Sequence, residues 1–187
     1  MNLALNLTYL RIALIPLFVV CFYIHNIFGY LATIGAFVIA SITDWLDGYC
    51  ARNLHLTSKF GAFLDPVADK LLVVTALVLV ANETTMFFTI IPVLLIICRE
   101  ILVSALREWM AQVGQAAAVK VSFGGKIKTT IQLTAIIVLL CSRNGYWFDY
   151  LWIKVVGIIL LYFAAGLSLW TLYQYVKVSV VSCRKCL

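Results

Sequence analysis

Charged residues are scarce in this chain of 187 residues. Only 12% of the residues are charged, whereas 64% are hydrophobic, and the mean hydropathy is +1.05. Soluble globular domains carry about 25% charged residues, so this composition excludes an ordinary soluble domain and indicates a polytopic membrane protein. The net charge of +6 then indicates contact with anionic membrane lipids and a preferred orientation, and we expect no nucleic-acid partner.

Histidine is rare, and cysteine is not organised into a framework. His25 and His55 have no second ligand at a useful spacing. The six cysteines stand mostly alone within apolar runs, so no disulfide framework is expected. Cys183 and Cys186 have metal or redox spacing, but without partners we interpret them as part of a loose tail. The sequence also lacks low-complexity tracts, long linkers and the inverted repeats of many transporters.

Long apolar runs fill most of the sequence. A helix needs about 20 apolar residues to cross roughly 30 Å of hydrocarbon, and runs of this length occupy residues 7–27, 31–52, 58–81, 86–109, 123–141 and 151–177. The first run contains Arg11 and leads directly into the second, so we do not expect a cleaved signal peptide. The sequence predicts an all-α integral membrane protein, a single domain over residues 1–187 with six transmembrane helices.

Four of the eight acidic residues lie between positions 44 and 69. Asp44 and Asp47 are three residues apart, and Asp65 and Asp69 are four apart, so each pair projects from one face of its helix. Carboxylates in an apolar setting take up protons unless cations compensate their charge. A set of oxygen ligands favours Mg²⁺ or Mn²⁺. The pattern therefore predicts a divalent metal site formed by two consecutive helices.

The helix faces of the four aspartates, here called the acidic stripe, also carry small and basic residues. Gly48 lies one turn after the first aspartate and Gly61 one turn before the third, so each leaves space for a ligand to approach the backbone. Arg52, at the expected helix end, suits a phosphate oxygen, and Ser58 can cap the next helix, whose N-terminus favours an anion. A structural ion network and a divalent-cation transporter are the alternatives, and neither accounts for the two glycines.

Written as one line, the pattern is Asp44-x-x-Asp47-Gly48-x-x-Ala51-Arg52, eight residues, then Gly61-x-x-x-Asp65-x-x-x-Asp69. It resembles the signature of the CDP-alcohol phosphotransferase family, with every fixed position filled. The strings GAFLDPVADK, SALREWMA and GKIKTT resemble the branch of that family that uses glycerol 3-phosphate as the acceptor alcohol. The similarity extends over nearly the whole chain.

The resemblance implies a metal-dependent phosphatidyltransferase of phospholipid synthesis. It implies two Mg²⁺ (or Mn²⁺) ions held by Asp44, Asp47, Asp65 and Asp69, with Asp69 also serving as the catalytic base. It further implies that CDP-diacylglycerol is bound by Thr8, Arg11, Gly48, Arg52, Ser58 and Gly61. For Arg11, the alternative is a side chain that snorkels to the lipid headgroups. The expected products are phosphatidylglycerophosphate and CMP.

Positive charge also converges in the fourth and fifth apolar runs. Arg99 and Arg107 are eight residues apart and Lys126 and Thr130 four apart, so each pair can share a helix face. We expect a small anionic acceptor, glycerol 3-phosphate, to bind the basic set Arg99, Arg107, Lys126 and Lys128. The alternative is that Glu100 and Glu108 neutralise the arginines as structural ion pairs. Inositol phosphate satisfies the charge argument equally well, and the motif spacing is shared by enzymes that use serine, so only the quoted strings favour glycerol 3-phosphate.

Lysine and arginine are unevenly distributed between the two sides of the expected bundle. One side holds Arg52, Lys59, Arg107, Lys120, Lys126, Lys128, Arg184 and Lys185, and the other holds Arg143 and Lys154. The positive-inside rule makes the first side cytoplasmic, together with both termini and the aspartates. The absence of a targeting extension suits a plasma (inner) membrane. The resemblance implies a homodimer, although no GxxxG stretch marks an interface.

Overall fold

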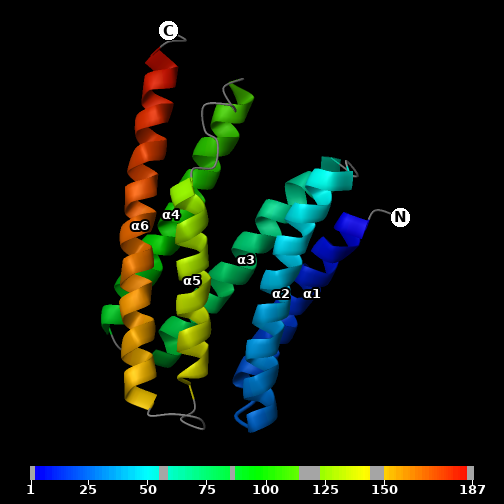
Figure 1. The fold of residues 1–187 in the computed structure, drawn as a ribbon, viewed down its shortest axis with the longest axis vertical. Coiled ribbons are helices and arrows are strands. Elements are labelled where there is room, and N and C mark those ends of the chain that lie inside the picture. The colour runs from blue at the N-terminus through cyan, green and yellow to red at the C-terminus, as the bar shows by residue number, and fades with distance from the viewer. Residues whose placement is uncertain (1–2, 55–58, 85–86, 114–122, 144–149, 185–187) are drawn as a thin grey trace. The chain divides into compact units, whose positions relative to one another are not determined.

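The computed structural model describes residues 3–54, 59–84, 87–113, 123–143 and 150–184, and the regular structure within these ranges is entirely helical (Figure 1). The helices are α1 (Leu3–Tyr23), α2 (Ile27–Leu54), α3 (Lys59–Thr84), α4 (Phe87–Gln112), α5 (Phe123–Cys141) and α6 (Tyr150–Arg184). Each helix overlaps one of the apolar runs, with ends that differ by up to seven residues, so the all-α prediction is confirmed.

Within the described residues, two helices are long and apolar enough to cross a membrane by themselves. They are α4 and the Leu151–Val180 stretch of α6, with mean hydropathies of 2.2 and 2.1. Only 33% of each hydrophobic window is buried, so most of these apolar side chains point outward, as lipid-facing side chains do. This indicates a membrane protein, whereas six membrane spans remain a prediction.

The chain divides into two compact units. Unit 1 comprises Met1–Glu83 and Leu140–Tyr150, and unit 2 comprises Thr84–Leu139 and Leu151–Leu187. The acidic stripe thus belongs to unit 1 and the basic set around Arg99 to unit 2. The single domain predicted over residues 1–187 stays a prediction.

In unit 1, α1 and α2 form an antiparallel pair joined by a short connection (Figure 1). The connection ends at Asn26, whose Oδ1 accepts a hydrogen bond of 2.7 Å from the backbone N–H of Gly29. This is the geometry of an N-cap, and it explains why α2 begins at Ile27. Phe18 and Phe37 pack between the two helices with ring centroids 5.8 Å apart.

In unit 2, α4 and α6 run parallel to each other. The Tyr162 hydroxyl of α6 donates a hydrogen bond of 2.7 Å to the carbonyl oxygen of Phe88 near the start of α4. Further along both helices, Val103 and Met110 of α4 pack in one buried cluster with Tyr175 of α6. Because contacts advance along both helices in the same direction, this register also sets which polar side chains of α4 and α6 meet.

Candidate functional site

The four aspartates lie on consecutive helices of unit 1. Asp44 and Asp47 are in α2, and Asp65 and Asp69 are in α3. Helical backbone at both pairs supports the expectation that each pair shares one helix face. The Asp69 side chain is half-buried, whereas the side chains of the other three lie outside the described residues. Among the side chains that are described, no group of three or more potential ligands gathers, so the metal set stays a prediction.

The residues expected to bind the nucleotide lipid are less completely described. Thr8 lies in α1, Gly48 and Arg52 in α2 and Gly61 in α3, but their surroundings, and Ser58 altogether, lie outside the described residues. Arg11 is described, and its side chain is fully buried, with 0% exposed. A guanidinium that snorkels to the headgroups would be exposed, so this burial argues against that alternative.

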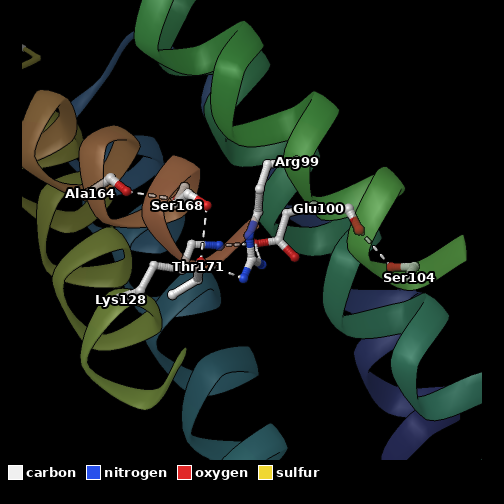
Figure 2. A network of polar contacts seen from close by, with 7 residues as sticks. All are labelled: Arg99, Glu100, Ser104, Lys128, Ala164, Ser168 and Thr171. Carbon is white, nitrogen blue, oxygen red and sulfur yellow. Dashed lines mark hydrogen bonds and ion pairs between the residues drawn. The ribbon is translucent and has the colours of Figure 1, made fainter. Parts of the chain in front are cut away.

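A polar network links the three helices of unit 2 (Figure 2). The Glu100 carboxylate of α4 accepts a hydrogen bond from the Lys128 ammonium of α5, and its Oε1 lies 3.4 Å from the Arg99 Nη1 atom. The Arg99 Nη2 atom donates a 2.8 Å hydrogen bond to the Thr171 hydroxyl of α6. Arg99 is 6% exposed and Lys128 is 0% exposed. The helices thus gather two buried cations around one shared carboxylate.

The network brings together two of the four residues expected to bind the acceptor. Arg99 and Lys128 meet at Glu100, whereas Arg107 is exposed further along α4, and the Lys126 side chain lies outside the described residues. Glu100 does pair with its basic neighbours, as the structural alternative expected. However, Glu100 supplies one negative charge to the two cations that it contacts, and the Arg99 Nε atom is buried with no hydrogen-bond partner among the described residues. An anion is therefore a suitable further ligand.

Thr171 and Ser168 of α6 take part in this network and were not expected from the sequence. The Ser168 hydroxyl donates to the carbonyl oxygen of Ala164 at 2.7 Å, and the Thr171 hydroxyl donates to that of Ser168 at 2.9 Å. The signal that points to them is a serine and a threonine three residues apart within an apolar run, since such a pair shares one helix face. Both side chains are essentially inaccessible to solvent.

Comparison with known proteins adds a family and named relatives. Residues 1–170 match the family described as CDP-alcohol phosphatidyltransferase. A Haemophilus influenzae protein named CDP-diacylglycerol–glycerol-3-phosphate 3-phosphatidyltransferase is 47% identical over 178 residues, which cover 95% of this chain and 93% of the relative. Proteins of the same name from Pectobacterium atrosepticum and Salmonella typhimurium are each 44% identical over 176 residues, covering 94% of this chain and 93% of the relative.

Proposed function

Because the chain belongs to the CDP-alcohol phosphatidyltransferase family, we propose that it transfers the phosphatidyl group of CDP-diacylglycerol to glycerol 3-phosphate. The products are phosphatidylglycerophosphate and CMP, so the protein is a transferase of anionic phospholipid synthesis. Relatives that cover more than nine-tenths of the chain carry the name of this activity, and the quoted strings of the sequence agree with them.

The observation that supports a phosphorylated acceptor is the buried cluster of Arg99, Lys128 and Glu100. The Arg99 Nε atom is buried there without a hydrogen-bond partner among the described residues, so a ligand that supplies an acceptor oxygen and negative charge is favoured. Glycerol 3-phosphate carries a phosphate group, whereas serine has no net charge at neutral pH. The cluster thus supports a phosphorylated alcohol, with Arg107 and Lys126 as additional contacts to be tested.

The donor set of unit 1 fits a divalent metal by its chemistry. Four carboxylates at helical spacing on α2 and α3 supply oxygen ligands alone, which suits Mg²⁺ or Mn²⁺ and neither a thiolate nor an imidazole metal. We assign the two ions of the proposal to Asp44, Asp47, Asp65 and Asp69. When bound, such ions supply charge compensation for a pyrophosphate and for the leaving phosphate.

The other residues of unit 1 bind the donor and move the proton. In the proposal, the cytidine diphosphate portion of the lipid is held by Thr8, Arg11, Gly48, Arg52, Ser58 and Gly61. Asp69 accepts the proton of the acceptor hydroxyl as its oxygen attacks the lipid-side phosphorus. A new phosphorus–oxygen bond to glycerol forms, and the bond between this phosphorus and the oxygen of CMP breaks.

The proposal includes a place in the cell. We infer that the protein lies in the plasma (inner) membrane and crosses it six times. Both termini and the aspartates then lie on the cytoplasmic side. The excess of lysine and arginine on that side supports this orientation. The resemblance to the family supports a homodimer.

The test is CMP release by the purified protein in detergent with CDP-diacylglycerol and Mg²⁺. Glycerol 3-phosphate, inositol phosphate and serine are compared as acceptors, and each reaction is repeated with a chelator. We expect release with glycerol 3-phosphate and Mg²⁺ together, and none without either. CMP release with inositol phosphate or serine, but not with glycerol 3-phosphate, would contradict the acceptor assignment. Metal flux in liposomes without any CMP release would contradict the proposed enzyme and support the alternative, a divalent-cation transporter.

A further inference from the structure

Thr171 is a buried polar residue within an apolar stretch of α6. Its side chain is 1% exposed, and its hydroxyl donates a hydrogen bond of 2.9 Å to the Ser168 carbonyl oxygen one turn earlier. A threonine hydroxyl has one donor and two acceptor lone pairs. Because the donor is engaged within α6, Thr171 can offer only an acceptor to α4. The 2.8 Å contact with Arg99 is therefore a hydrogen bond of fixed direction.

Arg99 is held from two sides, and its Nε atom keeps its donor for a ligand. Its Nη2 atom donates to Thr171 and its Nη1 atom faces Glu100 at 3.4 Å (Figure 2). Its Nε atom is buried and has no hydrogen-bond partner among the described residues. An unsatisfied buried N–H is unfavourable unless a ligand supplies an acceptor. Since the guanidinium is planar, fixing its two terminal nitrogens also fixes the direction of the Nε–H bond.

We propose that Thr171 is a positioning residue that holds Arg99 so that the Nε–H group of Arg99 meets a phosphate oxygen of the acceptor. The inference rests on the proposed function for the identity of this acceptor, and the chemical group it specifies is a phosphate monoester. Thr171 follows directly after residues 1–170, which the family description matches, so that match does not assign it a role.

The test replaces Thr171 by valine, which keeps the branched shape and removes the hydroxyl. Losing a hydrogen bond to a charged group lets the guanidinium turn away, so kcat/KM for glycerol 3-phosphate should fall by about tenfold or more. The KM for CDP-diacylglycerol should stay unchanged. Thr171→Ser restores the hydroxyl and should keep the acceptor kcat/KM within about threefold of the original, because the hydrogen bond to a charged group is retained.

Two controls separate positioning from general stability. Ser179→Ala removes another buried hydroxyl of α6, one that donates to the Tyr175 carbonyl oxygen of its own helix, and it should leave the acceptor KM unchanged. In an Arg99→Lys background the guanidinium is gone, so Thr171→Val should have little additional effect on the acceptor kcat/KM. A separate tenfold loss in that background would overturn the proposal.

Binding of inorganic phosphate gives a readout without the donor lipid. The full chain in detergent is titrated with phosphate, and the rise of its unfolding temperature is recorded. Thr171→Val should need about tenfold more phosphate for the same rise, whereas Ser179→Ala should match the original protein. If the original protein transfers to glycerol 3-phosphate but Thr171→Val changes neither the acceptor KM nor the phosphate titration, this inference alone fails. If it transfers to no phosphorylated alcohol, the proposed function itself fails.

Discussion

Asp69 has two assignments in the proposed reaction, as a metal ligand and as the base that receives the hydroxyl proton. Asp69→Asn retains an oxygen for the metal but cannot take up the proton. We expect CMP release to fall by about 10²- to 10⁴-fold, the usual contribution of a positioned base. Glu83→Gln makes the same chemical change at the other end of α3, where Glu83 pairs with Arg143, and should leave turnover unchanged. Near-normal turnover of Asp69→Asn would remove the residue from the base role.

Arg143 joins three segments of unit 1 at the end where α1 finishes. Its guanidinium lies 3.8 Å from the centroid of the Phe22 ring, and its Nε atom lies 3.6 Å from the Glu83 carboxylate. A desolvated cation over an aromatic ring contributes about 2 kcal/mol, and a planar guanidinium stacks better than an ammonium. Arg143→Lys should therefore lower the free energy of unfolding in detergent by about 1 kcal/mol. Combined with Phe22→Leu the losses should be less than additive, and full additivity would show that the ring contact contributes nothing.

At the scale of the element, α5 and α6 approach closely at Gly157. A Cβ atom on this residue would lie 2.7 Å from the Leu139 side chain and 3.3 Å from that of Val138. Leu139 is buried, with 4% exposed, so it cannot move aside without disturbing its neighbours. Gly157→Ala should lower the free energy of unfolding by about 1–3 kcal/mol, as overpacking does.

Gly166 provides the matched control for this prediction, since it lies in the same helix with nothing within 4 Å of its Cβ position. Gly166→Ala should be neutral or stabilising by up to about 1 kcal/mol, because alanine favours helix over glycine. In the Gly157→Ala protein, Leu139→Ala should lower the free energy of unfolding by less than it does in the original protein, because the new methyl group fills part of the space that the leucine leaves. Equal effects at the two glycines would contradict close packing between α5 and α6.

The helices themselves could be predicted, because an apolar run of membrane length has few other stable backbone arrangements. The run at residues 123–141 coincides with α5, Phe123–Cys141. The pairing of Arg99 with Thr171 could not be predicted. It joins residues 72 apart and depends on the parallel register of α4 and α6. Helices that are apolar on every side have little amphipathic pattern, so their sequences do not indicate which faces pack together or in which register. The helical placement of the four aspartates could be predicted because each pair lies within one apolar run, whereas the metal site that they would form stays a prediction.

At the scale of the whole molecule, the distribution of charge has to agree with the direction in which each helix crosses the membrane. The sequence 114–122 between α4 and α5 contains Lys120, and the sequence 144–149 between α5 and α6 contains only Asp149 as a charged residue. If α5 crosses the membrane once, these two connections lie on opposite sides of it. The positive-inside rule then assigns the first connection to the cytoplasm.

Cysteine labelling tests this orientation directly. In a variant whose six native cysteines are replaced by serine or alanine and which retains CMP release, Gln115→Cys and Asn144→Cys are compared with a membrane-impermeant maleimide. Because the first connection is expected in the cytoplasm and the second outside it, Asn144→Cys should react in intact cells, and Gln115→Cys only after the cells are opened or in inverted vesicles. Labelling of both positions in intact cells would contradict a single crossing by α5. The reverse pattern would place the Lys120 connection outside the cytoplasm and refute the cytoplasmic termini.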